Sequence, residues 1–596
     1  MRKKTDILSQ YYQAELSYLR IAGKNFAERH PEIAKRLDIS SVESADPQVE
    51  RMLESFAFLT GKLQYQIDSQ FPKFAKDLLD VIYPPIVRPT PSVTMVKFDI
   101  DTKRAVNAAG THIPKGTTLY TQLQNNHENI QFFFATCSDI DLWPLEIANV
   151  DVVSRDDVFT KDANFNNADK SIYYLKISLI WFGNEQTKQP NSLRFFMNGD
   201  QLFKSNLLAS ILLCETPVIF SQNCNYHKTQ KIHPIGLNED ESLFPYPKSV
   251  FRGFRLLHEY FYYPDKFCGF IVDIPDNITL NKDICIYVPI SDFLQLPFNE
   301  KPLLLHAVPA VNLFHKTTDP FRLTHTQNSY DLIADSRRSS FTEIYSIECL
   351  YQIDQTTNEV TKLQPFFARN DNSNSNNRKT YWIAERENSS FSDSAGSNIK
   401  ISFVDRNFNF NEPANKIFYA DVLCTNRSKA ESIQGYTKLQ ADLSLPVKSI
   451  YCLHRPTPQK PPLETGEALW GAISMLSLNS VPFVDCSTEK IKNILFIFAD
   501  SLASPLKNEI FAISKIASKN SSRLYRNDQW NGFIRGTTIS IEFDDSIQNR
   551  GIPLSLILAN FFSAYTGINS YVELITKIEN FREKKWPIKF GTHNYL

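Results

Sequence analysis

The chain has 596 residues, which is too long for one ordinary hydrophobic core and predicts about three or four folding units. Apolar residues make up 42% and charged residues 22%, a composition that excludes a disordered chain. The 64 Lys and Arg balance 65 Asp and Glu to a net charge of −1, which argues against nucleic-acid binding because phosphate neutralisation requires a basic excess.

The nine cysteines are scattered and form no CxxC pair, so we expect reduced, mostly buried thiols in a cytosolic protein. No apolar core follows the basic start MRKKTDILSQ, and we expect no signal peptide. The longest apolar runs, such as LSLILANFF, fall far short of the about 20 residues that cross a bilayer. The sequence therefore predicts a soluble protein without a membrane span.

The first 83 residues have the apolar periodicity of helices. Tyr12, Leu16 and Leu19 lie at i, i+4 and i+7, which places them on one helical face. This spacing predicts a first helix with a continuous apolar side.

A second helix is predicted from Pro47, because Asp46 is a good N-cap and proline is favoured at the first helical position. Its apolar stripe consists of Val49, Leu53, Phe56, Leu63 and Ile67, widened by Met52 and Leu59. A stripe of this width indicates packing on more than one neighbour. We expect a third, separate helix over 72–82.

The stretch YPPIVRPTPS ends the helical region, and the chain then alternates apolar and polar residues as strands do, for example in SVTMVKFDI. The sequence predicts a multidomain α+β protein, in which a helical region precedes mostly β modules and a C-terminal α/β region. The predicted divisions are a helical bundle region at 1–83, a proline-rich spacer at 84–91, a first β module at 92–235, a second at 236–454 with a polar insert at 368–398, and an α/β module at 455–596.

Motif searches give no sign of catalysis. The sequence has no Walker A, GxGxxG, HExxH, GxSxG or EF-hand pattern. The nearest metal candidate is the group Cys214, Cys224 and His227. Cys224 and His227 have the CxxH spacing of half a zinc site, but a second pair of ligands is missing. Cys452 and His454 are separated by one residue in a predicted strand, and we do not expect them to act together as a nucleophile and its base. We therefore predict no catalytic residue, no cofactor and no metal site, and hence no enzyme.

The aromatic block EYFYYPDKF at 259–267 is the densest cluster of rings. Its rings are Tyr260, Phe261, Tyr262, Tyr263 and Phe267. Three interpretations remain open: buried core, a protein interface, or a stacking platform for a ligand. The last would make the chain a β-rich carbohydrate-active enzyme or a ligand-binding protein.

Ordered segments along the whole chain resemble one known family. YYQAELSYLR, FAERHPEIAKRL and ADPQVERMLESFAFLTGKLQYQIDSQFP are similar to its opening helices, and LFPYPKSVFRGFRLLHEYFYYPDKF resembles its central block. IADSRR, CTNR, LWGAISMLSLNS, FIRGTTISIEFDD and the ending KFGTHNYL continue the match. The chain resembles the TssF family, also called VasA or ImpG, of the bacterial type VI secretion system baseplate.

This resemblance implies a structural, non-catalytic wedge subunit. Family members assemble with TssG, two TssF copies to one TssG, and with TssK and TssE. Wedges surround a central spike and hub, contact neighbouring wedges, and support the contractile tail. The resemblance also implies a cytoplasmic protein that lies at the cytoplasmic side of the bacterial inner membrane when assembled.

The resemblance further implies that N-terminal helices of the wedge proteins share a bundle. For that interface we predict Tyr12, Leu16, Leu19, Val49, Leu53, Phe56, Leu63 and Ile67. We read the aromatic block as packing that fixes a β module, with some rings at a subunit contact.

Overall fold

The structure is a computed structural model of the full chain. It describes residues 2–30, 32, 47–101, 110–125, 128–156, 172–183, 189–222, 225–228, 232–247, 250–275, 283–297, 301–323, 327–354, 358–366, 380–388, 396–405, 416–463, 466–476, 487–499, 505–527, 530–544, 547–567, 570–578 and 582–591.

The chain divides into two compact units. The helical unit comprises residues 1–87 and 463–477, and the β unit comprises 88–462 and 478–596. The segment 463–477 lies in the predicted C-terminal module by sequence, yet its contacts place it in the helical unit. Contacts between distant segments, which local sequence patterns do not carry, decide this membership.

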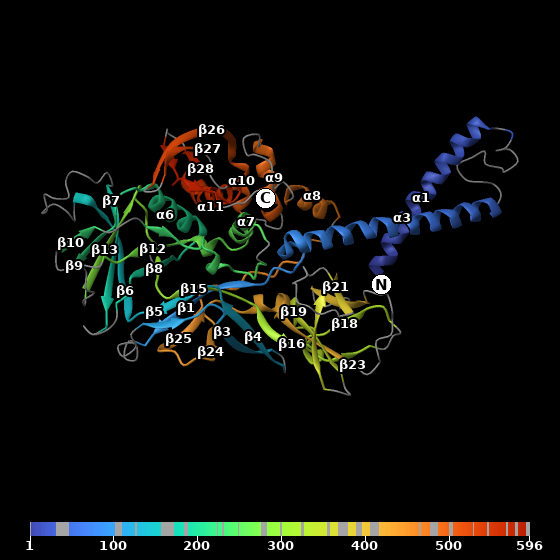
Figure 1. Ribbon diagram of the computed structural model, residues 1–596, viewed down its shortest axis with the longest axis horizontal. Coiled ribbons are helices and arrows are strands. Elements are labelled where there is room, and N and C mark those ends of the chain that lie inside the picture. The colour runs from blue at the N-terminus through green and yellow to red at the C-terminus, as the bar shows by residue number, and fades with distance from the viewer. Residues whose placement is uncertain are drawn as a thin grey trace. The chain divides into compact units, whose positions relative to one another are not determined.

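The helical unit contains α1 (Arg2–Arg29), α3 (Pro47–Ile82), the short 3₁₀ helix η1 (Pro84–Ile86) and α8 (Gly466–Leu476). Figure 1 shows α1 crossing α3. The expectation of a separate helix over 72–82 is wrong, because α3 runs through Pro72 as one helix. Proline removes one helical hydrogen bond, but Ala75 and Leu79 beyond it are fully buried and α8 packs on α3. Tertiary packing therefore outweighs the local signal.

The β unit contains a closed barrel, whose first strand begins at Val93. Among the described strands, its order is β1 (Val93–Ile100), β15 (Ala307–Val311), β4 (Glu128–Thr136), β3 (Thr118–Asn125), β24 (Lys438–Ala441) and β25 (Val447–Cys452). Val96 of β1 is opposite Val308 on one side and Cys452 on the other. The barrel thus joins strands from both predicted β modules: β1 and β15 pair although they lie more than 150 positions apart in sequence.

Two sheets enclose a second core with α6 (Gln201–Leu213). The first sheet is β10 (Asn225–Lys228), β9 (Ile219–Gln222), β13 (Asp283–Ile290), β7 (Tyr173–Trp181) and β6 (Leu145–Ser154). The second is β11 (His233–Pro234), β12 (Gly269–Asp273), β8 (Ser192–Met197) and β14 (Leu303–Leu304). Asp200 caps α6 by accepting the N–H of Phe203, as its position before the apolar run predicts.

A third sheet follows in chain order. Its strands are β16 (Phe314–Thr317), β23 (Lys416–Thr425), β19 (Glu343–Asp354), β20 (Val360–Pro365), β21 (Thr380–Asn388), β22 (Ser397–Asp405) and β18 (Tyr330–Leu332), with β17 (Phe321–Arg322) also paired to β23. The short pair β2 (Thr111–Ile113) and β5 (Ile140–Leu142) forms a sheet of its own, and its residues Ile113, Ile140 and Leu142 pack in the core of the barrel. The predicted insert 368–398 overlaps β21, and residues 370–377 lie outside the described residues.

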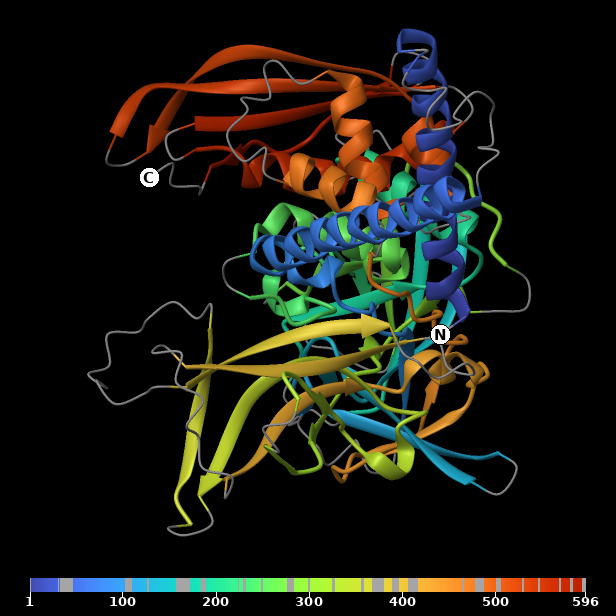
Figure 2. The ribbon, with the colours of Figure 1, turned by 90° about the vertical axis from the view of Figure 1, so that its right-hand side faces the viewer.

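The C-terminal region is a sheet covered by helices. Its strands are β26 (Ile513–Asn527), β27 (Trp530–Phe543), β28 (Ser570–Ile578), β29 (Arg582–Lys585) and β30 (Lys589–Phe590). Its helices are α9 (Thr488–Ala499), α10 (Pro505–Phe511) and α11 (Gly551–Ala564). Strands β27 and β28 are parallel and α11 connects them, a β-α-β unit that matches the predicted α/β region (Figure 2).

Helices and several sheets occur together in separate cores, which confirms the predicted multidomain α+β class. Within the described part of the chain, no helix combines the length and apolar character needed to cross a membrane.

Candidate interaction surface

Helices α1 and α3 approach each other closely at Gly61. A Cβ atom at this position would lie 3.1 Å from the backbone nitrogen of Tyr12 and 3.2 Å from the carbonyl carbon of Tyr11. Glycine therefore permits a backbone contact that any side chain would obstruct. Away from the crossing, Nη2 of Arg20 donates to Oε1 of Glu50 at 2.5 Å and joins the two helices.

The side of α3 around Gly61 is covered. Ala57 and Gly61 are buried, and Leu53 and Thr60 are half-buried at matching helical spacing. Small residues at such a crossing allow two helices to pack closely. This side of α3 is therefore covered by contacts within the same chain.

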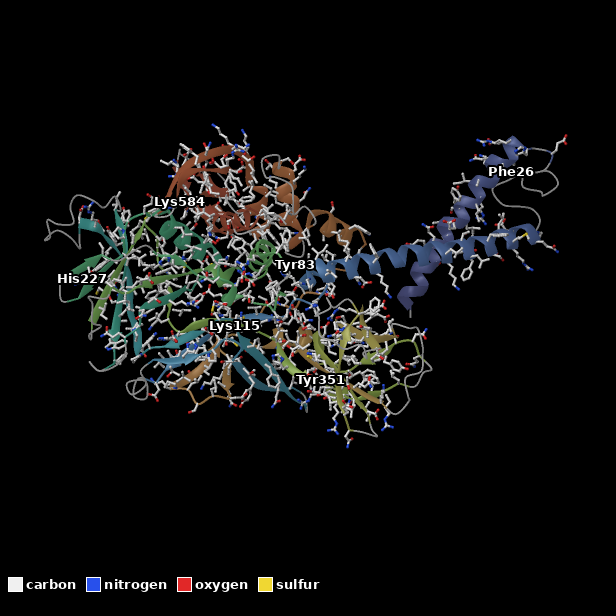
Figure 3. All side chains as sticks on the ribbon, viewed as in Figure 1. Phe26, Tyr83, Lys115, His227, Tyr351 and Lys584 are labelled. Atoms are coloured by element: carbon white, nitrogen blue, oxygen red, sulfur yellow. The ribbon has the colours of Figure 1, made fainter. Side chains whose placement is uncertain are left out.

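A neighbouring side of α3 is open. Met52, Phe56, Leu59 and Leu63 lie at i, i+4, i+7 and i+11, and each is 55% to 63% exposed. We call these four residues the open stripe. On α1, Tyr18 and Ile21 are exposed as well, and so is Phe26 near its C-terminal end (Figure 3). Contiguous large apolar side chains in water mark a surface that binds another protein.

The structure separates the eight predicted bundle residues into three groups. Tyr12, Leu16, Leu19 and Leu53 are half-buried, whereas Phe56 and Leu63 belong to the open stripe. The side chains of Val49 and Ile67 lie outside the described residues. Their assignment to a shared bundle stays a prediction.

The aromatic block lies in the β unit on α7 (Arg252–Tyr262) and the 3₁₀ helix η4 (Pro264–Phe267). The five rings named from the sequence, Tyr260, Phe261, Tyr262, Tyr263 and Phe267, are each at most 6% exposed. Stacking of a base or sugar requires an open ring face, and these rings present none.

The block connects segments that are far apart in sequence. The hydroxyl of Tyr262 donates to the carbonyl oxygens of Pro91 (2.7 Å) and Pro458 (3.1 Å). The hydroxyl of Tyr260 donates to Oε2 of Glu509 on α10 at 2.9 Å. Burial raises the pKa of Glu509 to about 8, so this carboxyl group is largely neutral at pH 7. The block therefore fastens the proline-rich segments and the C-terminal region to α7.

Buried charges support the same helix. Glu259 is fully buried, accepts the N–H of Leu243 at 2.9 Å and pairs with the buried Lys266. Arg255 lies 3.7 Å from Glu259 and donates to the carbonyl oxygens of Leu237 and Asn238. Burial lowers the pKa of Lys266, an effect that the Glu259 carboxylate opposes. The sequence does not reveal this network, because Glu259 and Lys266 resemble ordinary surface charges.

Among the described residues, the candidates for chemistry show no arrangement of a reactive site. Cys452 is fully buried, and burial raises the pKa of its thiol to about 12, so it is a neutral thiol rather than a nucleophile. Cys224 lies outside the described residues. Among the residues that are described, no group of three or more His, Cys, Asp or Glu side chains is arranged to hold a metal ion.

Two hollows, each of about 280 Å³, lie beside His306 in the β unit. One is lined by Asp139 and Asp141, but Oδ1 of Asp139 accepts the N–H of Lys115 and Asp141 pairs with His112. Both carboxylates are exposed, unlike the enclosed acid pair of a glycoside hydrolase. No ring of the aromatic block lines either hollow.

The profile of the family described as "Type VI secretion system, TssF" matches residues 4–593. The chain belongs to the TssF family. It is 26% identical over 99% of both chains to the type VI secretion system component TssF1 of Pseudomonas aeruginosa strain PAO1.

Two solved structures have a similar fold to this TssF-family chain. One is a chain of the TssK-TssF-TssG baseplate subcomplex, with a TM-score of 0.74, 20% identity, and coverage of 92% of this chain and 99% of that one. The other belongs to the baseplate complex of the type VI secretion system, with a TM-score of 0.58, 18% identity, and coverage of 98% and 99%.

Two features of the helical unit were not predicted from the sequence. The first is the crossing at Gly61, although a glycine inside a strongly periodic helix signals a packing reason. The second is the exposure of Tyr18 and Ile21, which lie off the predicted face of α1.

Proposed function

We propose that this chain is a non-catalytic wedge subunit of a type VI secretion baseplate, and that its helical unit joins a TssG-like partner in a complex that also contains a TssK-like protein. Family membership and the fold shared with a chain of the TssK-TssF-TssG subcomplex support this proposal.

The observation that carries the proposal is the open stripe of α3. Burying one large apolar side chain contributes about 1.5–3 kcal/mol, so four such residues on one helical face favour association strongly. The geometry is that of a helix whose covered side packs within its own chain and whose open side awaits another helix.

The finer arrangement follows from the family resemblance. We propose two copies of this chain per TssG-like protein, further contacts with TssE, the spike and hub and neighbouring wedges, and a position at the cytoplasmic side of the bacterial inner membrane. The near-neutral net charge of −1 fits an assembly component better than a nucleic-acid binder.

Co-expression with TssG-like and TssK-like partners tests the proposal. Size-exclusion chromatography with light scattering gives the mass of the product. We expect a stable complex in which this chain contributes twice 68.5 kDa for each TssG-like chain. A well-behaved monomer of 68.5 kDa in the presence of both partners would contradict the proposal.

A further inference from the structure

A third hollow, of about 250 Å³, lies where the barrel meets the sheet of β16 and β23. Strand β4 of the barrel lies beside β16, as Figure 1 shows. Phe133 of β4 and Phe314 of β16 form an aromatic wall with ring centroids 5.0 Å apart. The half-buried Phe341 adds a third ring to the lining. One part of the hollow is therefore apolar and concave.

The lining of the hollow also includes cationic side chains. Arg337 and Arg338 belong to the 3₁₀ helix η5 (Ser336–Arg338), and together with Lys316 they line the hollow. None of its lining residues is an Asp or Glu. The hollow thus combines aromatic rings with three positive side chains.

The local structure holds these cations in place without neutralising them all. Asp335 accepts the backbone N–H groups of Arg337 and Arg338 and pairs with Lys316 at 2.5 Å, and Asp319 accepts the N–H of Ser336. The Lys316 ammonium lowers the pKa of Asp335, so this carboxylate stays ionised. By contrast, neither guanidinium group of Arg337 or Arg338 has a side-chain partner within the part of the chain that the structure describes.

An acidic peptide segment fits this lining better than other ligands. Guanidinium groups hold carboxylates in paired, planar hydrogen bonds, and aromatic rings favour a large apolar side chain beside them. The volume lies slightly below the about 300 Å³ at which small-ligand pockets begin, which suits one or two anchoring side chains. A lipid headgroup would satisfy the arginines but leave the aromatic wall empty.

We propose that this hollow is a docking site for a segment of another baseplate subunit that carries an Asp or Glu next to a large apolar residue. The carboxylate binds Arg337 and Arg338, and the apolar side chain packs on Phe133 and Phe314. This inference rests on the proposed function, because it takes the occupant from the baseplate. The site lies in the β unit and is separate from the open stripe of the helical unit.

Photo-crosslinking in intact cells tests the docking site. The photoreactive amino acid p-benzoylphenylalanine replaces Gln131, a half-buried residue that lines the hollow without belonging to the proposed contacts, or, as a control, the exposed Arg322 of β17. We expect position 131 to crosslink to one baseplate subunit, at a peptide with an acidic residue beside an apolar one, and position 322 to give no such product.

Charge reversal tests the chemistry. The double variant Arg337→Glu/Arg338→Glu removes two charge-assisted contacts, and we expect it to weaken binding of the crosslinked subunit by about 100-fold. The matched double variant Arg322→Glu/Lys362→Glu makes the same charge change at exposed positions and should leave binding unchanged. Reversing the crosslinked acidic residue to Arg should restore binding to the first variant.

The outcomes separate the two proposals. A crosslink to lipid, to a segment without an acidic residue, or equally from positions 131 and 322 overturns the docking site. Equal binding by the two double variants does the same. The proposed function is tested separately, by co-purification from the same cells. It is contradicted if the wild-type chain does not co-purify with TssG-like and TssK-like proteins.

Discussion

Replacing Phe56 by Asp places a carboxylate in the middle of the open stripe of α3. Phe56 is 55% exposed, so a partner that covers it buries about half of the side chain. Since complete burial of a Phe contributes about 1.5–3 kcal/mol, the missing ring costs about 1–1.5 kcal/mol of binding free energy. A charge left unpaired in the contact adds at least about 2 kcal/mol. We therefore expect the dissociation constant for the TssG-like partner to rise by at least about 100-fold.

The free chain should be little affected. Substitutions at exposed positions usually change the free energy of unfolding by less than about 0.5 kcal/mol, so the variant should fold as the wild type does. Mass photometry over a dilution series gives the dissociation constant of the complex, and circular dichroism of the free chain checks its helix content. Leu63→Asp, at the C-terminal end of the same stripe, should weaken binding to a similar extent.

Phe58 provides the matched control, because it lies on the same helix, is 48% exposed, and is two residues from Phe56, about 200° around the helix. Phe58→Asp introduces the same charge on another side of α3. The reasoning is refuted if Phe58→Asp weakens the complex as much as Phe56→Asp, or if Phe56→Asp binds like the wild type.

Three further predictions concern the fold. Gly61→Ala should loosen the α1–α3 contact and speed hydrogen exchange in α1, because the new Cβ lies 3.1 Å from the backbone of Tyr12. In the control variant Gly471→Ala on α8, the new Cβ meets open space, and the substitution should stabilise that helix by up to about 1 kcal/mol. Equal hydrogen exchange of α1 in both variants would argue against a tight crossing. Because the pKa of Glu509 is about 8 in the folded chain against an ordinary 4.5, the folded state keeps a proton that the unfolded state loses, and stability should fall by about 1.4 kcal/mol per pH unit as pH rises from about 4.5 to 8. Glu509→Gln should remove this loss in urea unfolding at pH 5, 6.5 and 8, and a pH dependence equal to that of the wild type would show that Glu509 ionises normally. Deleting residues 370–377 should leave folding intact, and complete loss of soluble protein would contradict this expectation.

Local patterns predicted the helical unit well. The face of Tyr12, Leu16 and Leu19 and the start of α3 at Pro47 follow from helical periodicity and capping preferences, which act within a few residues. The same patterns failed at Pro72, because the packing that carries α3 through this proline comes from α8, nearly 400 residues away.

The candidate sites were predictable in part. Helical periodicity placed Phe56 and Leu63 on the apolar stripe of α3, but the sequence could not say which residues of that stripe the crossing at Gly61 would cover. From the sequence, Arg337 and Arg338 stood out only as part of the segment IADSRR, which carries the family resemblance. Their hollow forms from β4 and β16, which are about 180 residues apart in sequence, so no local signal placed Phe133 beside Phe314.

A cryo-electron microscopy map of the purified complex with TssG-like and TssK-like proteins would show whether the open stripe of α3 binds the TssG-like chain. The account predicts helical density from the TssG-like chain packed on Met52, Phe56, Leu59 and Leu63 of α3. A map in which these four side chains face solvent while the partner binds elsewhere would contradict it.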